Sequence, residues 1–135
     1  MLCIGAAHLD KVFTFFHTPH EEEELPASSE DIFGGCAYNS ACALRLQGID
    51  VSFVTLLGQD IAGDQVISNL QSLGVDTSQV HHLETAQTGM YVSFHRPSGD
   101  LFIAAADMDV YRRFTPEMLE QSLSLIHISE PTRPY

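Results

Sequence analysis

Positive charge is scarce in this sequence. Six Lys and Arg residues stand against 18 Asp and Glu residues, so the formal net charge is −12, and Lys11 is the only lysine. A nucleic-acid backbone or an anionic membrane surface requires clustered positive charge, so neither is expected as a partner. A compact phosphorylated ligand is still compatible with this composition, because backbone N–H groups at helix starts can hold phosphate without a basic side chain.

Cysteines and long apolar runs are also few. Cys3, Cys36 and Cys42 are an odd number set among small or apolar neighbours. This pattern predicts buried free thiols in a reducing compartment rather than a disulfide framework, and the spacing is not that of a zinc site. No apolar run approaches the roughly 20 residues of a membrane helix, and no basic segment followed by an apolar run opens the chain. These absences predict a cytoplasmic protein.

The apolar pattern predicts an α/β fold in one domain or part of one. Residues 2–7 and 51–57 are short apolar runs, typical of strands buried in a parallel sheet. Helical patterns follow at 36–48 and 60–74, each ending in glycine, and Asp60 can cap the second. Strands and helices that alternate in this way indicate an α/β layer.

Other segments predict β-structure outside that layer. Residues 12–16 favour a strand, the acidic segment 17–31 predicts an exposed flap or loop, and 90–105 predicts a hairpin. A short helix is expected from a cap at Thr115 towards Leu123. Residues 125–135 contain two prolines and predict a tail that does not belong to the native domain.

The most informative stretch is 34–41, Gly-Gly-Cys-Ala-Tyr-Asn-Ser-Ala. Two glycines before a helix allow a tight turn and close approach of a ligand, and Asn39 offers a donor and an acceptor in the first turn. This arrangement suits a hydroxyl-rich ligand. For an isolated Gly-Gly pair, a loop break with Asn39 facing water is the favoured alternative. Here Gly48 and Gly58 follow at a fixed spacing.

With that spacing, the stretch from Gly34 to Gly58 resembles the first signature of the ribokinase (pfkB) family of sugar and nucleoside kinases. Gly5–Asp10 and Gly58–Asp76 resemble the flanking segments of the same family, so the resemblance covers residues 2 to about 121. It implies an incomplete ribokinase-like, Rossmann-like three-layer αβα sheet with a β lid. The lid would come from about 11–33 and 88–106, within an N-terminal part of a kinase domain at 1–124.

The resemblance also implies which residues bind the substrate. In the family, an aspartate after the first strand and an asparagine after Gly-Gly bind sugar hydroxyls. The substrate-binding candidates of this chain are therefore His8, Asp10, Gly34, Gly35 and Asn39. His8 departs from the family pattern, which often has Asn two residues before the aspartate. For Asp10 taken alone, the alternative is a carboxylate that caps a nearby amide.

By resemblance, the reaction is phosphoryl transfer from ATP, with Mg²⁺, to a hydroxymethyl group of a small-molecule sugar or nucleoside. The family's catalytic Gly-Ala-Gly-Asp lies near the end of a longer chain. Residues 61–64 are superficially similar, but they lack its first glycine and are explained by the start of a helix. The chain is therefore expected to contain no catalytic, cofactor-binding or metal-binding residue and to be inactive alone.

Two further expectations concern partners and specificity. The alternative to a kinase part is a non-catalytic carbohydrate-binding or dimerising fragment. A homodimer through the lid is one partner that the pattern allows. The segment 102–111, followed by Thr-Pro-Glu, most resembles pseudouridine kinase-type members. Ribose, fructose-type sugars, adenosine and other nucleosides stay open as substrates, because lid contacts decide specificity.

Two groups of side chains invite other interpretations. His17 and His20 near Glu21–Glu24, and the pair His81–His82, lack convergent ligand spacing, so solvated loops are predicted instead of metal sites. The aromatic residues between 13 and 16 predict packing within a lid or an interface more than a stacking platform for bases.

Overall fold

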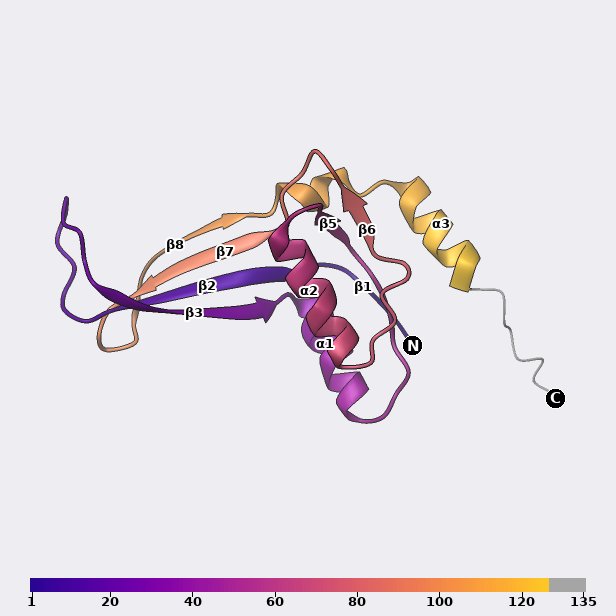
Figure 1. Ribbon diagram of the computed structural model, residues 1–135, viewed down its shortest axis with the longest axis horizontal. Coiled ribbons are helices and arrows are strands. Elements are labelled where there is room, and N and C mark those ends of the chain that lie inside the picture. The colour runs from indigo at the N-terminus through magenta and orange to yellow at the C-terminus, as the bar shows by residue number, and fades with distance from the viewer. Residues whose placement is uncertain (127–135) are drawn as a thin grey trace.

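The computed structural model describes residues 1–126 and has two parts, a small α/β layer and a long β-sheet that projects from it (Figure 1). The elements in chain order are β1 (Leu2–Ile4), β2 (His8–Phe15), β3 (Ala27–Gly34), α1 (Cys36–Leu46), β4 (Ser52–Val54), β5 (Leu56–Gly58), α2 (Ile61–Ser72), β6 (His81–Leu83), β7 (Met90–His95), β8 (Leu101–Asp107), the 3-10 helix η1 (Asp109–Arg113) and α3 (Pro116–Ile126).

The α/β layer has helices on both faces. β1 pairs with β4 and β5 pairs with β6, all parallel, so alternate side chains point to opposite faces. Cys3 and Leu57 belong to the core formed with α1 and α2. Leu56 and His81 are register partners on the other face, where the His81 ring contacts Phe114 and α3. The predicted three-layer α/β arrangement is therefore present.

The strand expected at 51–57 is divided in two. The ladder of β4 is with β1 and that of β5 is with β6, so the strand pairing changes at Thr55; Ser52 of β4 also forms an isolated parallel bridge to Asp76. The strand expected at 2–7 is also shorter than predicted and ends at Ile4. Gly5 follows with φ +151°, and a side chain there would lie 2.8 Å from Ala37 Cβ. A continuous apolar sequence shows burial, but it does not show where a strand changes its partner.

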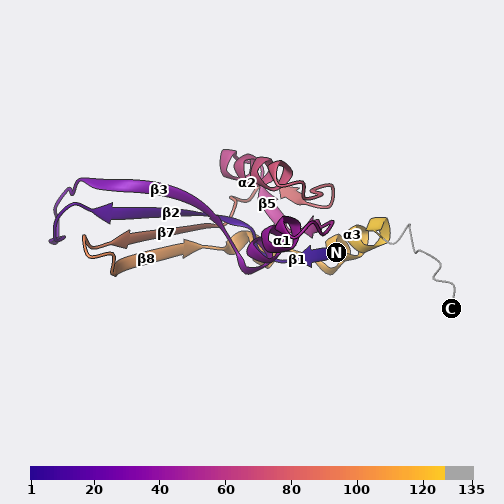
Figure 2. The ribbon, with the colours of Figure 1, turned by 90° about the horizontal axis from the view of Figure 1, so that it is seen from below.

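The projecting sheet is the predicted lid. Its four strands lie side by side in the order β3-β2-β7-β8 and extend well beyond the helices (Figure 2). β2 and β7 run parallel, while β3 and β8 pair antiparallel at the two edges. The predicted hairpin is confirmed as β7–β8, with Gly99 at φ +92° in its turn.

An exposed flap or loop was expected at 17–31, but the last five residues of this segment form a strand. Residues 27–31 belong to β3, which pairs with β2 along the whole length of both strands. β3 is an edge strand with mostly exposed side chains, so it carries polar residues on both faces and shows no apolar alternation. Only its pairing with the more apolar β2 makes it a strand.

Most of the predicted helix ends are confirmed. Gly48 and Gly74 follow α1 and α2 in left-handed conformations, and Thr115 Oγ1 accepts a hydrogen bond from the Met118 amide at the start of α3. α3 continues through Ile126, two residues into the segment expected to be a tail. Residues 127–135 lie outside the described part. None of the helices described up to residue 126 is long and apolar enough to cross a lipid bilayer.

Candidate functional site

The predicted substrate-binding residues meet where the lid joins the α/β layer. His8 and Asp10 are two residues apart on β2, so their side chains share one face of the lid. Gly34, at the end of β3, is the register partner of His8. Gly35 and α1 follow directly, and the backbone N–H of Asn39 donates to the Gly35 carbonyl at 2.9 Å. The sequence spacing thus becomes proximity through the pairing of β2 with β3.

His8 and Asp10 form a close pair at this point. His8 Nδ1 lies 2.7 Å from Asp10 Oδ1, with the two side chains 16% and 26% exposed. Both atoms are buried, and within residues 1–126 neither has another polar partner. The pair turns the second oxygen of Asp10, Oδ2, towards the backbone of Gly34. His8 is therefore positioned to orient the carboxylate, whatever its departure from the family pattern.

Gly34 and Gly35 each require glycine, but for different physical reasons. A side chain at Gly34 would lie 2.8 Å from Asp10 Oδ2 and 3.0 Å from His8 Cε1, so this glycine makes room for the pair. Gly35 has φ +114°, and a Cβ there would lie 2.2 Å from the Ala6 carbonyl oxygen. That second contact is with backbone, which cannot move aside. Gly34 is therefore tied to the site, and Gly35 to the close packing of α1 against the end of β1.

Asn39 lies one turn into α1 and is exposed. Its neighbour Tyr38 points into the core and hydrogen-bonds Asn69 on α2, which fixes the rotation of the helix. Cys36, in the first turn, is exposed as well. The expectation of buried thiols is thus wrong for Cys36, because the core-facing side of α1 starts at Tyr38. It is right for Cys3 and half right for Cys42, which is half-buried.

The site offers hydrogen-bonding groups of both kinds and few charges. Asp10 supplies a carboxylate acceptor, Asn39 an amide, and the first turn of α1 contains no acidic side chain. A carboxylate and a side-chain amide are both suited to hydrogen bonding with a vicinal diol, because each hydroxyl is both donor and acceptor. These residue types therefore suit a polyhydroxylated ligand.

Residues 60–64 form a helix start, as expected. Asp60 caps α2 by accepting from the Gly63 amide at 2.8 Å, and its carboxylate also accepts from the Thr88 amide at 2.8 Å and the Thr88 hydroxyl at 2.6 Å. Thr88 ties α2 to the base of β7 and is not among the residues predicted from the sequence. Its only sequence signal is a hydroxyl residue directly before Gly89 and a strand.

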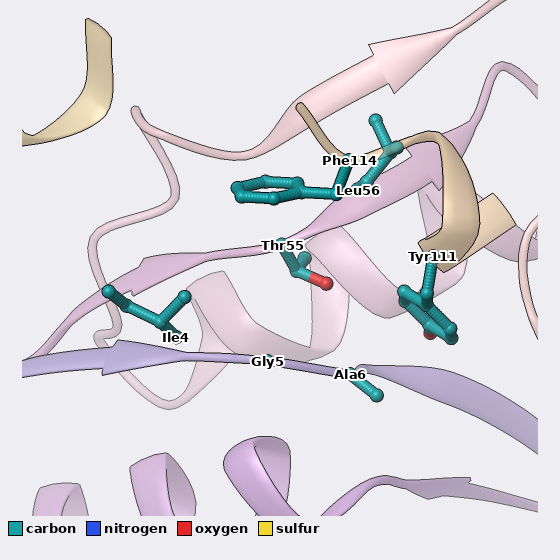
Figure 3. A pocket seen from close by; sticks show the side chains of 7 residues that line it. All are labelled: Ile4, Gly5, Ala6, Thr55, Leu56, Tyr111 and Phe114. Atoms are coloured by element: carbon teal, nitrogen blue, oxygen red, sulfur yellow. The ribbon is translucent and has the colours of Figure 1, made fainter. Parts of the chain in front are cut away.

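An apolar hollow of about 320 Å³ lies on the face of the sheet opposite α1 and α2 (Figure 3). Its only polar side chains are Thr55, whose buried hydroxyl has no hydrogen-bond partner within residues 1–126, and Tyr111. Burial raises the pKa of Tyr111 to about 12, and its hydroxyl donates to the Ala7 carbonyl. None of the predicted substrate-binding residues lines this hollow. The lining is Ile4, Gly5, Ala6, Thr55, Leu56, Tyr111 and Phe114.

Neither His17 and His20 nor His81 and His82 belong to a cluster of metal ligands within residues 1–126. No group of three or more His, Cys, Asp or Glu side chains within residues 1–126 could hold a metal ion. A solvated loop was expected for His81 and His82, but both residues lie in β6. His81 is half-buried and its Nε2 lies 2.7 Å from Ser122 Oγ, whereas His82 is exposed. A strand of three residues is too short to show a period in the sequence.

The sequence matches a known family over nearly its whole length. The profile described as pfkB family carbohydrate kinase matches residues 2–130. The chain is 27% identical over 93 residues to an uncharacterized sugar kinase of Escherichia coli, covering 69% of this chain and 26% of that protein. It is 23% identical over 121 residues to the pseudouridine kinase of the same organism, covering 90% and 39%, and 30% identical over 108 residues to a deoxyribokinase of Salmonella typhi, covering 77% and 35%.

Solved structures show the same relationship. A carbohydrate kinase from Agrobacterium tumefaciens superposes with a TM-score of 0.87 at 28% identity, covering 95% of this chain and 42% of that one. A fructokinase from Xylella fastidiosa, described with bound ATP, has a TM-score of 0.71 at 25% identity, covering 87% and 36%. The chain thus spans between 26% and 42% of these five proteins.

Proposed function

Because this chain belongs to the pfkB family of carbohydrate kinases, we propose that it is the substrate-binding part of an enzyme that phosphorylates a sugar or nucleoside at a hydroxymethyl group. The observation that carries the proposal is the His8–Asp10 pair held over Gly34 at the base of the lid. This pair presents Asp10 Oδ2 beside the start of α1. There the oxygen can accept hydrogen bonds from hydroxyl groups of a substrate.

Each residue has a distinct part in the proposed binding. Asp10 accepts hydrogen bonds from two neighbouring hydroxyls of the substrate, and His8 holds its carboxylate in place. Gly34 leaves room for the pair, and Asn39 donates and accepts from the side of α1. The lid strands then cover the substrate and exclude water, which would otherwise compete as acceptor of the phosphoryl group.

Side-chain support for ATP and Mg²⁺ is weak at the candidate site. The site contains no Lys or Arg, and Lys11, the chain's only lysine, is paired with Asp31 at 3.1 Å. Asp10, the carboxylate of the site, is already paired with His8. We therefore propose that ATP and Mg²⁺ bind outside residues 1–126 and that this chain alone transfers no phosphoryl group. The fructokinase described with bound ATP is covered only to 36%.

The cellular compartment of the protein is proposed from its cysteines. We propose a reducing, cytoplasmic environment, which the three free cysteines support, because none of them has a disulfide partner among residues 1–126.

The experiment compares binding with catalysis. The chain is titrated with a panel of sugars and nucleosides by NMR, and ATP-dependent phosphorylation of the same panel is measured on the chain and on the longer genomic product. We expect saturable binding by the chain, no turnover by the chain and turnover by the longer product, with Asp10→Asn lowering binding and turnover. Absence of turnover in the longer product would show that the kinase proposal is wrong.

A non-catalytic, dimerising fragment is the second candidate. The observation in its favour is the run of exposed apolar side chains on β8, where Leu101, Phe102 and Ile103 are 50%, 45% and 58% exposed. Three adjacent exposed apolar residues on an edge strand are suited to an interface between copies of the lid. The same surface would serve a homodimer of the kinase, so dimerisation by itself does not exclude the first proposal.

A further inference from the structure

The lid register places an aromatic side chain next to Asp10. Asp10 is the register partner of Ile32 on β3 and of Tyr91 on β7, and Tyr91 is in turn the partner of Ala106 on β8. Residues directly opposite one another in a sheet point to the same face. Four side chains therefore form a row across this face of the lid. Their order is Ile32, Asp10, Tyr91 and Ala106, and Asp10 is the one that belongs to the candidate site.

The contact at Gly34 confirms which face this is. Asp10 Oδ2 and His8 Cε1 lie over Gly34, so the face that carries the row is also the face of the His8–Asp10 pair. The pair and Tyr91 are thus on one surface, and neighbouring strands are about 4.8 Å apart. A ligand bound to Asp10 that extends by one strand towards β7 crosses the position of Tyr91.

The neighbours of Tyr91 on β8 are small. Ala106 is exposed and Ala104, the next residue of β8 on the same face, is half-buried, so both neighbours on that side are small. Tyr91 itself is half-buried, and its strand neighbour on this face is Ser93. On the other side of Asp10, Ile32 offers only an aliphatic surface that is 43% exposed. The flat surface next to the carboxylate therefore belongs to Tyr91.

We propose, on the premise of the function proposed above, that Tyr91 is a specificity-determining residue that stacks on the planar base of a nucleoside. In a nucleoside the base is attached to the carbon next to the one that carries the 2′-hydroxyl. When Asp10 binds the ribose hydroxyls, the base therefore reaches the adjacent strand. A free monosaccharide has only a hydroxyl at that carbon and leaves the Tyr91 ring uncovered. The site thus selects nucleosides over simple sugars.

The test measures affinity for ligands that differ only in the base. The chain and its variants are titrated with D-ribose, uridine and adenosine, and chemical-shift changes give the dissociation constants. We expect both nucleosides to bind more tightly than ribose. Tyr91→Ala should weaken nucleoside binding by about tenfold to a hundredfold, the range expected for loss of one base–aromatic stack. Ribose binding should change less than about twofold, because a ligand without a base forms no stack on the ring.

Three control variants separate the possible outcomes. Tyr91→Phe keeps the ring and should keep the nucleoside preference, while Ile32→Ala removes an apolar side chain on the other side of Asp10 and should leave it unchanged. Equal affinities for ribose and nucleosides, or equal losses for both in Tyr91→Ala, overturn the role of Tyr91 but leave the proposed function intact if Asp10→Asn still abolishes binding. No saturable binding of any of the three ligands by the folded chain overturns the proposed function itself.

Discussion

At the residue scale, Asp60 shows how one side chain joins segments that are distant in sequence. Its carboxylate accepts from Gly63 on α2 and twice from Thr88, and the Thr88 hydroxyl accepts in turn from the Gly58 amide at 3.0 Å. Burial raises the pKa of Asp60, but the hydrogen bonds from Thr88 and Gly63 outweigh it and hold the pKa below its usual value. The charged form is therefore the one that the fold stabilises.

Replacing Asp60 by alanine should lower the free energy of unfolding by about 2 kcal/mol, because a helix cap and the partner of Thr88 are lost together. Asp64→Ala is the matched control, since Asp64 is an exposed carboxylate of the same first turn and should cost less than about 0.5 kcal/mol. Urea unfolding measures both variants. Equal effects would show that helix-dipole charge, and not the network, is what Asp60 contributes.

His81 should make stability depend on pH. Burial lowers the pKa of His81, and the charge of neighbouring His82 lowers it further, against a backbone hydrogen bond that raises it. The unfolded chain therefore binds a proton at this position more readily than the folded chain, so stability falls as pH drops below about 6.5. His81→Gln should flatten the thermal stability between neutral and mildly acidic pH, whereas His82→Gln should not. An unchanged slope in His81→Gln would contradict the assignment.

At the scale of elements, the lid depends on how β2, β3 and α1 meet. The helix patterns were predictable because apolar spacing and glycine ends are local features of the chain. β3 was not, because its strand character comes only from pairing with β2, and the break at Thr55 was not, because it reflects two different strand partners. The convergence of Asp10 with Gly34 was expected from the family resemblance, but their contact required the register of the lid.

The two glycines between β3 and α1 should respond differently to alanine. Gly35→Ala should cost on the order of 3 kcal/mol or prevent folding, because the φ is left-handed and the new Cβ meets the Ala6 carbonyl oxygen. Gly34→Ala meets only the ends of the Asp10 and His8 side chains, so it should cost less than about 1 kcal/mol and yet displace the carboxylate.

Circular dichroism during urea unfolding and NMR titration with the ligand that binds best distinguish the two effects. Gly34→Ala should be folded and defective in binding, whereas Gly35→Ala should be defective in folding. Retained binding in a folded Gly34→Ala variant would contradict the placement of Asp10 in the site.

At the scale of the whole molecule, two long-range properties oppose each other. The net charge of −12 makes copies repel one another, while the lid exposes apolar side chains well away from the helices (Figure 2). The aromatic side chains Phe13, Phe15 and Phe94 stack within the lid, which is the packing that their pattern predicted. Phe16 is 66% exposed and takes no part in that stack.

Raising the ionic strength should therefore increase self-association through the lid, because salt screens the repulsion and leaves apolar contacts in place. Light scattering after size-exclusion chromatography measures the mass. Ile103→Glu adds a charge to the exposed edge strand and should keep the chain monomeric, whereas Ile61→Glu, on a still more exposed apolar side chain of α2, should not. Dimerisation that persists in Ile103→Glu would place the interface elsewhere.

The sequence by itself determined the α/β class, the helices with their caps, the hairpin and the family to which the chain belongs. Each of these depends on residues close together in the chain or on a spacing within one segment. Only the tertiary structure decided that His8 pairs with Asp10 above Gly34, that Thr88 ties the lid to α2, and that Tyr91 stands beside the candidate carboxylate. These contacts depend on strand register, which is set by packing between segments that the sequence keeps far apart.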